Sequence, residues 1–555
     1  MSGALGVGRL LLTLVGTSLL AGWPQTVPER TQLKRTSTVM EVQAFMEALR
    51  KQAPGLEPYQ PKDSPRATET GRPLLAWRLK GTGPDPLRVY VNANIHAGEV
   101  EGKEAIQQIL RELLQGKHPA LRRDLDLVVM PAYNADGTDA LDPAIRPWQP
   151  NPTESGVGRR ENALGLDLNR DLMKAAAPNT RWLLAMLQDF DPAAVLDLHT
   201  TNGSTHGFHL THGPACTLGA DEDLLAFNRK MLVEVREHLK AEGMPTYDYG
   251  NFIPYKPTPE KPPTAWETYD AHPRLLTNYP ALRNRLAVLS ESYVYRSWPD
   301  RISDTRRFVL ACLGWMAEHR NEIRTQIRSA QTRWTDAWAQ GPVALPLSAK
   351  LKEVEHASFD WVDPIRDEKG RLVGEKSRTH LVLPSFVGFE GQDFVPVPAG
   401  YLVDPAFAPT VLPLLQAHGL KVLEGRARPR TLPLLRFEET GRKLSPSAYQ
   451  GVFTLELQGA WKAEVAPKPM ELPWTPADLD RALYVPLNQP LGRLAFYLLD
   501  PRSTDSLVFW GLFHTVLLRG NGMWGEPPRF PILAVGKGDD AAPVVPSSPM
   551  AKTQE

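Results

Sequence analysis

A histidine and a glutamate, three residues apart, follow an apolar run in this 555-residue chain. The run at 89–95, VYVNANI, has the composition of a buried β-strand, and helical periodicity begins at Val100. His96 and Glu99 are therefore expected on a turn between a strand and a helix. Open α/β sheets collect their ligands at the carboxyl ends of strands. Imidazole and carboxylate in such a place predict a metal site.

Two further strand ends carry polar groups of the same kind. His199 ends the apolar run AAVLDLH at 193–199, and Glu291 follows the apolar run at 286–290. A catalytic zinc site uses three nitrogen or oxygen ligands and leaves the fourth position to water. His96, Glu99 and His199 match that set. A carboxylate at the end of an apolar strand is costly unless it has a task or a partner, and Glu291 would have one as a general base beside the metal.

The stretch GLDLNRD at 165–171 lies between these ligands in the sequence. A zinc-bound histidine commonly has a carboxylate behind it that fixes its tautomer and orientation, and Asp167 is a candidate for this role. Asn169 and Arg170 place an amide donor beside a guanidinium, a pair suited to binding a carboxylate.

Four motifs occur in the order HAGE (96–99), GLDLNRD (165–171), DLHTTNG (197–203) and LSESY (289–293). Together they resemble the zinc carboxypeptidase (funnelin-type metallocarboxypeptidase) family over roughly residues 60–330. The resemblance implies one Zn²⁺ per chain, held by His96, Glu99 and His199. It further implies that Asp167 orients a metal histidine, that Asn169 and Arg170 bind the terminal carboxylate of the substrate, and that Glu291 is the general base and acid.

Two family roles have several candidates here. The family has an arginine that polarises the scissile carbonyl, and Arg160 is favoured over Arg146 and Arg159. It also has a tyrosine that caps the substrate some two dozen residues before the catalytic glutamate. Tyr269 lies 22 positions before Glu291 and is favoured over Tyr279. Trp148 and Tyr133 are left open as substrate contacts.

Three histidines, at positions 206, 209 and 212, raise the question of a second metal site. The segment GFHLTHG at 207–213 is predicted to be a strand, whose side chains alternate between two faces. His206 and His212 would then share a face and His209 would point away. We therefore expect no second site, and expect His206 or His209 to line the cleft.

Strands alternating with helices predict an α/β fold: a mixed, mostly parallel central sheet flanked by helices, in a zinc carboxypeptidase-like catalytic domain at 38–335. Expected helices lie at 38–52, 180–190, 223–240 and 304–328, and expected strands at 74–79, 89–95, 125–130, 194–198 and 286–290. Short apolar runs separated by Gly and Pro predict a β-rich accessory region at 340–535, with a candidate linker at 464–476 that would split it in two. The tail at 536–555 is predicted to be disordered.

The amino terminus has the features of a secretory signal peptide. Arg9 precedes an apolar run at 10–20, which Ala21 and Gly22 follow. The run is shorter than the roughly 20 residues that span a bilayer. We therefore expect a signal peptide at 1–22, export to the periplasm or the exterior, and no membrane span after cleavage.

Composition excludes some functions and leaves other questions open. Lys+Arg and Asp+Glu both number 63, so the chain has no net charge and shows no nucleic-acid footprint. Cys216 and Cys312 either form one disulfide or remain free thiols. The oligomeric state is not readable from the sequence.

The function predicted from these patterns is that of an exported zinc metallocarboxypeptidase acting on peptides with a free C-terminus. An alternative keeps the metal: a zinc amidohydrolase or deacylase acting on N-acyl amino acids or cell-wall peptides. A third hypothesis is an inactive scaffold with a binding module in its second half. The intact set of His96, Glu99, His199 and Glu291 argues against an inactive site.

Overall fold

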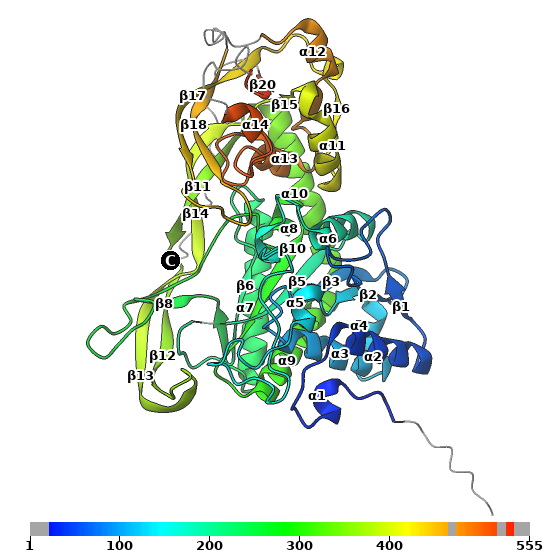
Figure 1. The fold of residues 1–555 in the computed structure, drawn as a ribbon, viewed down its shortest axis with the longest axis vertical. Coiled ribbons are helices and arrows are strands. Elements are labelled where there is room, and N and C mark those ends of the chain that lie inside the picture. The colour runs from blue at the N-terminus through cyan, green and yellow to red at the C-terminus, as the bar shows by residue number, and fades with distance from the viewer. Residues whose placement is uncertain (1–21, 202, 464–472, 519–528, 538–555) are drawn as a thin grey trace, which may run out of the picture.

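The computed structural model describes residues 22–201, 203–463, 473–518 and 529–537. Its main sheet has eight strands in the order β1-β2-β4-β3-β5-β10-β6-β7 (Figure 1). The four strands β4, β3, β5 and β10 are parallel, whereas β1, β2 and β6 form antiparallel pairs. The expected mixed sheet is thus confirmed. The strands are β1 (Leu56–Tyr59), β2 (Ala76–Leu79), β3 (Leu87–Ala93), β4 (Leu125–Met130), β5 (Ala194–Thr200), β6 (Leu210–Pro214), β7 (Thr246–Asp248) and β10 (Leu286–Ser292).

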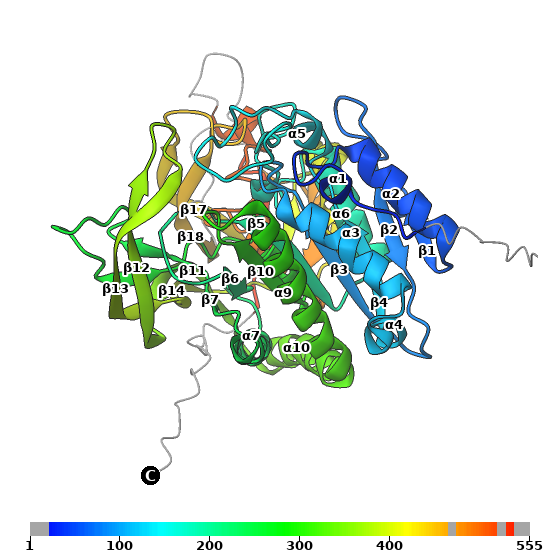
Figure 2. The same ribbon diagram turned by 90° about the horizontal axis from the view of Figure 1, so that it is seen from below.

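Alternate residues of the central strands pack into two hydrophobic clusters, one on each face of the sheet. Val89 and Val91 of β3 belong to the first cluster, whereas Tyr90 between them belongs to the second. The first face is covered by α2 (Val39–Gln52), α3 (Glu101–Leu114), α7 (Glu222–Ala241) and α9 (Trp298–Glu318). Figure 2 shows α2, α3 and α9 side by side over this face. The second face is covered by α6 (Pro178–Asp189) and by segments from beyond residue 340.

Two expectations about local structure need correction. The single helix expected at 304–328 is two helices, because α9 ends at Glu318 and α10 (Arg320–Gln340) begins after His319. The backbone of His319 is non-helical, with φ −97° and ψ 17°, and no Gly or Pro marks this break in the sequence. The expected loop at 244–281 contains β7 and the short strands β8 (Asn251–Ile253) and β9 (Ala265–Glu267), and ends in α8 (Tyr279–Leu282).

The chain beyond α10 is β-rich, as expected, with short helices between the strands. One sheet extends β9 and β8 by the hairpin of β12 (Glu355–Arg366) and β13 (Leu372–Phe386), and β11 (Ala344–Lys352) pairs with β14 (Gly388–Pro396). The six-stranded sheet of this region has the order β16-β19-β15-β20-β17-β18. Its strands are β15 (Gly400–Val403), β16 (Leu423–Glu424), β17 (Leu434–Leu444), β18 (Leu455–Ala463), β19 (Leu483–Pro486) and β20 (Ile532–Val535), and the helices are α11 (Ala408–Ala417), α12 (Pro476–Arg481), α13 (Gly492–Leu499) and α14 (His514–Leu517).

The division of the chain near 464–476 is not seen in the strand order. β15 to β18 precede this segment and β19 and β20 follow it, yet all six belong to one sheet. The expected boundary near 335–340 also does not separate two cores. Leu168 and Leu172 belong to the same hydrophobic cluster as Leu494 and Leu498 of α13. The region beyond 340 therefore shares its core with the main sheet, above which much of it lies in Figure 1.

Two predicted terminal segments lie outside the described residues, apart from a residue or two each. These are the signal peptide at 1–22 and the tail at 536–555. Within the described part of the chain, no helix combines the length and the apolar character that crossing a membrane requires.

Candidate active site

Three neighbouring parallel strands bring the candidate ligands to one edge of the sheet. β5 lies between β3 and β10, so the carboxyl ends of all three strands meet. His96 and Glu99 follow β3, while His199 and Glu291 lie near the ends of β5 and β10. The β-ladder pairs Glu291 directly with His199. The alternation of faces places both on the side that α6 and the C-terminal region cover.

The three predicted metal ligands converge. The Nδ1 atoms of His96 and His199 lie 3.1 Å apart, and the Glu99 carboxylate lies 3.2 Å from the first and 2.9 Å from the second. All three residues are buried, with 3–5% of their surface exposed. In the described residues this is the one group of three or more His, Cys, Asp or Glu side chains placed to hold a metal ion.

A carboxylate holds the far nitrogen of each histidine. Nε2 of His96 lies 3.1 Å from Oδ1 of Asp167, and Nε2 of His199 lies 2.7 Å from Oδ2 of Asp197. Such contacts fix the ring and leave Nδ1 for a metal. Asp167 was predicted from the sequence, but Asp197 was missed. Its signal was the D-x-H spacing, which puts two side chains on the same face of a strand.

The electrostatics of this cluster favour positive charge at its centre. Burial opposes charge on His199, but the carboxylates of Asp197 and Glu99 outweigh it and raise the pKa of the imidazole well above its usual value. Burial likewise disfavours ionised Glu99, but His96 and Arg146 reverse this and hold its pKa well below the usual range. Two ring nitrogens and a carboxylate that together attract positive charge suit Zn²⁺, and the residues present therefore fit this ion.

Two arginines lie beside Glu99. Arg146 donates a hydrogen bond from Nη2 to Oε1 of Glu99 at 2.7 Å. Arg160 donates to Oδ2 of Asp167 from Nε at 3.1 Å and from Nη2 at 2.8 Å, and its Nη1 lies 3.9 Å from Oε1 of Glu99. Arg159 is exposed. Arg146 and Arg160 therefore both reach the cluster. Arg160 is half-buried and is the one of the two that is hydrogen-bonded to Asp167.

Glu291 occupies an apolar strand end with 8% of its surface exposed. Burial raises the pKa of its carboxyl to about 8, and the nearby charges of Glu99 and Asp197 act in the same direction, against the effect of His199. A carboxyl that titrates near neutral pH can accept and return a proton under physiological conditions.

Asn169 and Arg170 lie in a short 3₁₀ turn, Leu168–Arg170, that Asp167 caps by accepting a hydrogen bond from the Asn169 backbone N–H. Oδ1 of Asn169 accepts a hydrogen bond of 2.7 Å from the backbone of Leu276. Nη1 of Arg170 donates to the Asn169 carbonyl at 2.8 Å, and its side chain is half-buried. Asn169 and Arg170 therefore lie next to Asp167, whose carboxylate contacts His96.

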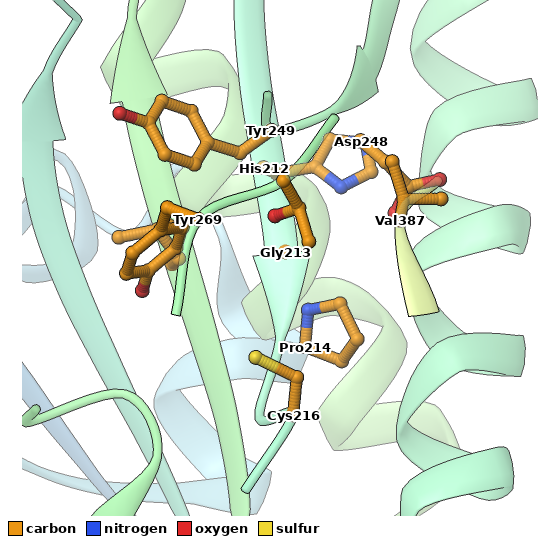
Figure 3. A pocket seen from close by; sticks show the side chains of 10 residues that line it. His212, Gly213, Pro214, Cys216, Asp248, Tyr249, Tyr269 and Val387 are labelled. Atoms are coloured by element: carbon orange, nitrogen blue, oxygen red, sulfur yellow. The ribbon is translucent and has the colours of Figure 1, made fainter. Parts of the chain in front are cut away.

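Tyr269 lies on a small pocket near Glu291. Its ring contacts that of Tyr249 edge-on, with centroids 5.2 Å apart. Both tyrosines line this pocket together with Cys216, Leu289 and Val387, and Figure 3 shows the two tyrosines on one side of it and Val387 on the other. Leu289 lies two residues before Glu291 and faces the same side of β10.

Some alternatives from the sequence are excluded by burial. The Tyr279 side chain is fully buried, and its hydroxyl lies 2.7 Å from Nδ1 of His418, so it is part of the core and cannot cap a substrate. Tyr133 is also fully buried in the core. Cys216 and Cys312 are separate free thiols.

The three histidines at 206–212 occupy three different environments. His206 packs on Tyr293, with ring centroids 4.2 Å apart, His212 stacks on Phe308, and His209 lies 3.5 Å from Asp304. The strand begins only at Leu210, so the expected alternation from position 206 is wrong. His206 and His212 are buried, and burial lowers the pKa of each to about 3.

The part of the chain that carries His96 and Glu99 is similar to a known family. Residues 42–190 match the family model described as zinc carboxypeptidase. This segment includes His96, Glu99, Asp167, Asn169 and Arg170, and it ends before His199. The similarity to zinc carboxypeptidases in sequence therefore extends over residues 42–190.

Two curated proteins, each described as "Probable carboxypeptidase 2", match the chain. They come from Trichophyton verrucosum and Arthroderma benhamiae, and each is 28% identical over 124 residues, or 22% of this chain. The matches span 21% and 20% of the length of these relatives.

Solved structures of metallocarboxypeptidases also match. That from Burkholderia cenocepacia is 14% identical and covers 52% of this chain and 70% of its own, with a TM-score of 0.38. That from Pseudomonas aeruginosa is 18% identical and covers 54% and 70%, with a TM-score of 0.37. Carboxypeptidase A from Helicoverpa armigera is 14% identical and covers 52% and 75%, with a TM-score of 0.38.

Proposed function

We propose that this chain is an exported zinc metallocarboxypeptidase that hydrolyses the C-terminal peptide bond of peptides. The observation that carries the proposal is the convergence of His96, Glu99 and His199, with a carboxylate behind each imidazole and Glu291 on the adjacent strand. The zinc carboxypeptidase match at 42–190 supports the same activity.

His96, Glu99 and His199 would hold a Zn²⁺ ion, which would supply Lewis acidity toward the scissile carbonyl and toward a water. Glu291 takes the proton of the attacking water on its carboxylate and passes it to the nitrogen of the leaving amine. The guanidinium of Arg160 stabilises the negative charge that develops on the carbonyl oxygen, while Asp167 holds both Arg160 and His96 in place.

Asn169 and Arg170 bind the terminal carboxylate of the substrate, which restricts cleavage to the last peptide bond. Tyr269, on the pocket beside Leu289, covers the bound residue. The proposed ligands lie at strand ends, and Asn169, Arg170 and Tyr269 lie in loops. We propose that these loops bring the substrate to the carboxyl edge of the sheet, where the ligands are.

The remaining assignments follow from the sequence. Residues 1–22 act as a signal peptide and direct export to the periplasm or the exterior, and residues 38–335 carry the catalytic groups. Residues 340–535 form an accessory region. This region packs against the proposed catalytic domain, because residues of both belong to one hydrophobic cluster.

Measuring zinc content and hydrolysis of blocked dipeptides tests the proposal. The mature chain and its Glu291→Gln variant should each hold one zinc, while turnover falls by about 10²–10⁴-fold in the variant because it lacks the proton acceptor. Glu237→Gln, an exposed change on α7, is the matched control. A Glu291→Gln chain that keeps its zinc and most of its activity contradicts the role of Glu291. Zinc without cleavage of any dipeptide in the parent favours the deacylase alternative.

A further inference from the structure

The turn between β17 and β18 lies against the loop that carries Asp167, Asn169 and Arg170. Oε1 of Gln450 accepts a hydrogen bond from the backbone N–H of Asp167 at 2.8 Å. The backbone carbonyl of Gln450 accepts another from Nζ of Lys174 at 2.7 Å. Gln450 therefore bonds to both ends of the segment 167–174, although it is more than 270 residues away in the sequence.

The backbone of this turn is left-handed at Gln450 and at Gly451. Gln450 has φ 51° and Gly451 has φ 77°, and the left-handed region is unusual for a residue with a side chain. A Cβ atom on Gly451 would lie 3.4 Å from Cδ2 of Leu166, so the turn packs directly on the loop. Such conformations persist where the surrounding contacts hold them.

The segment after Tyr269 is attached to the same C-terminal region. Nε of Arg274 forms an ion pair with Asp505 at 2.9 Å, and its guanidinium lies over the ring of Trp510. The backbone carbonyl of Arg274 accepts a hydrogen bond from Leu172, and Leu276, two residues on, donates to Asn169. Asn169 thus links the segment 167–174 to the segment 274–276, and the C-terminal region contacts both segments.

A third segment of this region borders the pocket. Val387, between β13 and β14, lines it opposite Tyr249 and Tyr269 (Figure 3). The C-terminal region thus contacts the predicted carboxylate-binding loop, the segment after Tyr269 and the pocket that Tyr269 lines.

We propose that Gln450 is a positioning residue for substrate binding. Its amide oxygen holds the Asp167 backbone and thereby fixes the 3₁₀ turn that presents Asn169 and Arg170 to the terminal carboxylate of the substrate. This inference rests on the proposed carboxypeptidase function. The Asp167 side chain contacts His96 and Arg160, while its backbone N–H donates to Gln450.

Gln450→Met tests this role, because methionine keeps the length of the side chain and removes the acceptor. We expect KM for peptides with a free C-terminal carboxylate to rise by about five- to tenfold, the range of one hydrogen bond lost at a binding site, with kcat changed less than twofold. KM for the same peptides with an amidated C-terminus should not change. Gln450→Glu, which restores an acceptor oxygen, should recover part of the loss.

Zinc content and thermal midpoint serve as readouts that do not depend on turnover. Zinc content should match the parent, and the midpoint should fall by only a few degrees, because one buried N–H loses its acceptor. Gln458→Met, an exposed change on the neighbouring strand β18, is the matched control. Equal KM values for the parent and Gln450→Met overturn the inference, and so does an equal rise for free and amidated peptides, which indicates a purely structural role. A parent chain that cleaves no peptide overturns the proposed function and this inference with it.

Discussion

Each candidate zinc histidine is oriented by its own carboxylate, and the two carboxylates come from different parts of the structure. Asp167 lies in the loop at 165–171, whereas Asp197 lies on the same strand as the histidine that it holds. Asp197 is in turn held by Asn92, whose Nδ2 donates to it at 2.9 Å. The Nε2 side of the His199 ring is therefore held from strands β3 and β5, and Nδ2 of Asn169 lies 3.5 Å from the same nitrogen.

Removing the charge of Asp197 should weaken metal binding. In Asp197→Asn the amide can no longer stabilise the far N–H of His199 as strongly, so zinc affinity should fall by about 10–100-fold. Competition with a chelator of known affinity measures this. Asp63→Asn, an exposed aspartate, should bind zinc as the parent does. Unchanged affinity in Asp197→Asn contradicts the role of this carboxylate.

The acidic side of the pH profile should report Glu291. Burial raises its pKa to about 8, and the carboxylate form is the one that accepts a proton, so kcat/KM should rise as pH increases through the pKa of this group. A bound dication lowers that pKa, so the midpoint should fall below 8 in the zinc enzyme. Measurement of kcat/KM from pH 4 to pH 9 checks the sign. Activity that increases as pH falls contradicts Glu291 as the base.

At the scale of elements, strand ends bring the candidate ligands together, and irregular segments carry the groups proposed to bind the substrate. The carboxyl ends of β3, β5 and β10 lie side by side, because β5 pairs in parallel with both β3 and β10. Asn169, Arg170 and Tyr269 lie outside the strands, in segments whose positions depend on side-chain contacts such as that of Asn169 with the Leu276 backbone.

Arg170→Ala tests what the 3₁₀ turn contributes. In the proposed function Arg170 binds the substrate carboxylate through a charged hydrogen bond. Loss of the guanidinium should therefore raise KM for peptides with a free C-terminus by about ten- to a hundredfold. Amidated peptides lack that charge, and their KM should change little. Arg159→Ala removes an exposed arginine of the same loop region and should leave both values unchanged. An equal effect on both kinds of peptide contradicts carboxylate binding by Arg170.

At the scale of the whole molecule, the two halves of the chain share one hydrophobic cluster. Leu183 of α6 and Tyr90 of β3 belong to it together with Leu494 and Val508. Arg283 also donates to the backbone carbonyl of His418, across the boundary expected from the sequence. The C-terminal region therefore covers a face of the main sheet that would otherwise meet water.

A chain that ends at residue 340 should not fold stably. Each large apolar side chain that loses its cover costs about 1.5–3 kcal/mol, and many side chains of the shared cluster would be affected. Calorimetry should show one unfolding transition for the full chain and none for the truncated one. A chain that ends at Lys537 keeps every described strand and should unfold like the full chain. A truncated chain that unfolds cooperatively at the same midpoint contradicts a shared core.

The sequence alone determined the elements and the residues that lie at their ends. Apolar runs predicted β4 at its observed bounds and placed His199 and Glu291 at strand ends, because periodicity and burial are local properties of the chain. His96 and Glu99 lie on one turn after β3, and they meet His199 because parallel strands end at one edge of a sheet. The family resemblance added roles for these residues.

Only the tertiary structure decided the rest. It removed Tyr279 as a candidate, since a hydrogen bond to His418 depends on a segment that follows it by 139 residues. It joined the two regions expected on either side of residue 340 through a common core, and it brought Gln450 to Asp167. These contacts depend on how distant surfaces pack. No local pattern of residue types records such packing, because its free energy comes from surfaces that meet only in the folded chain.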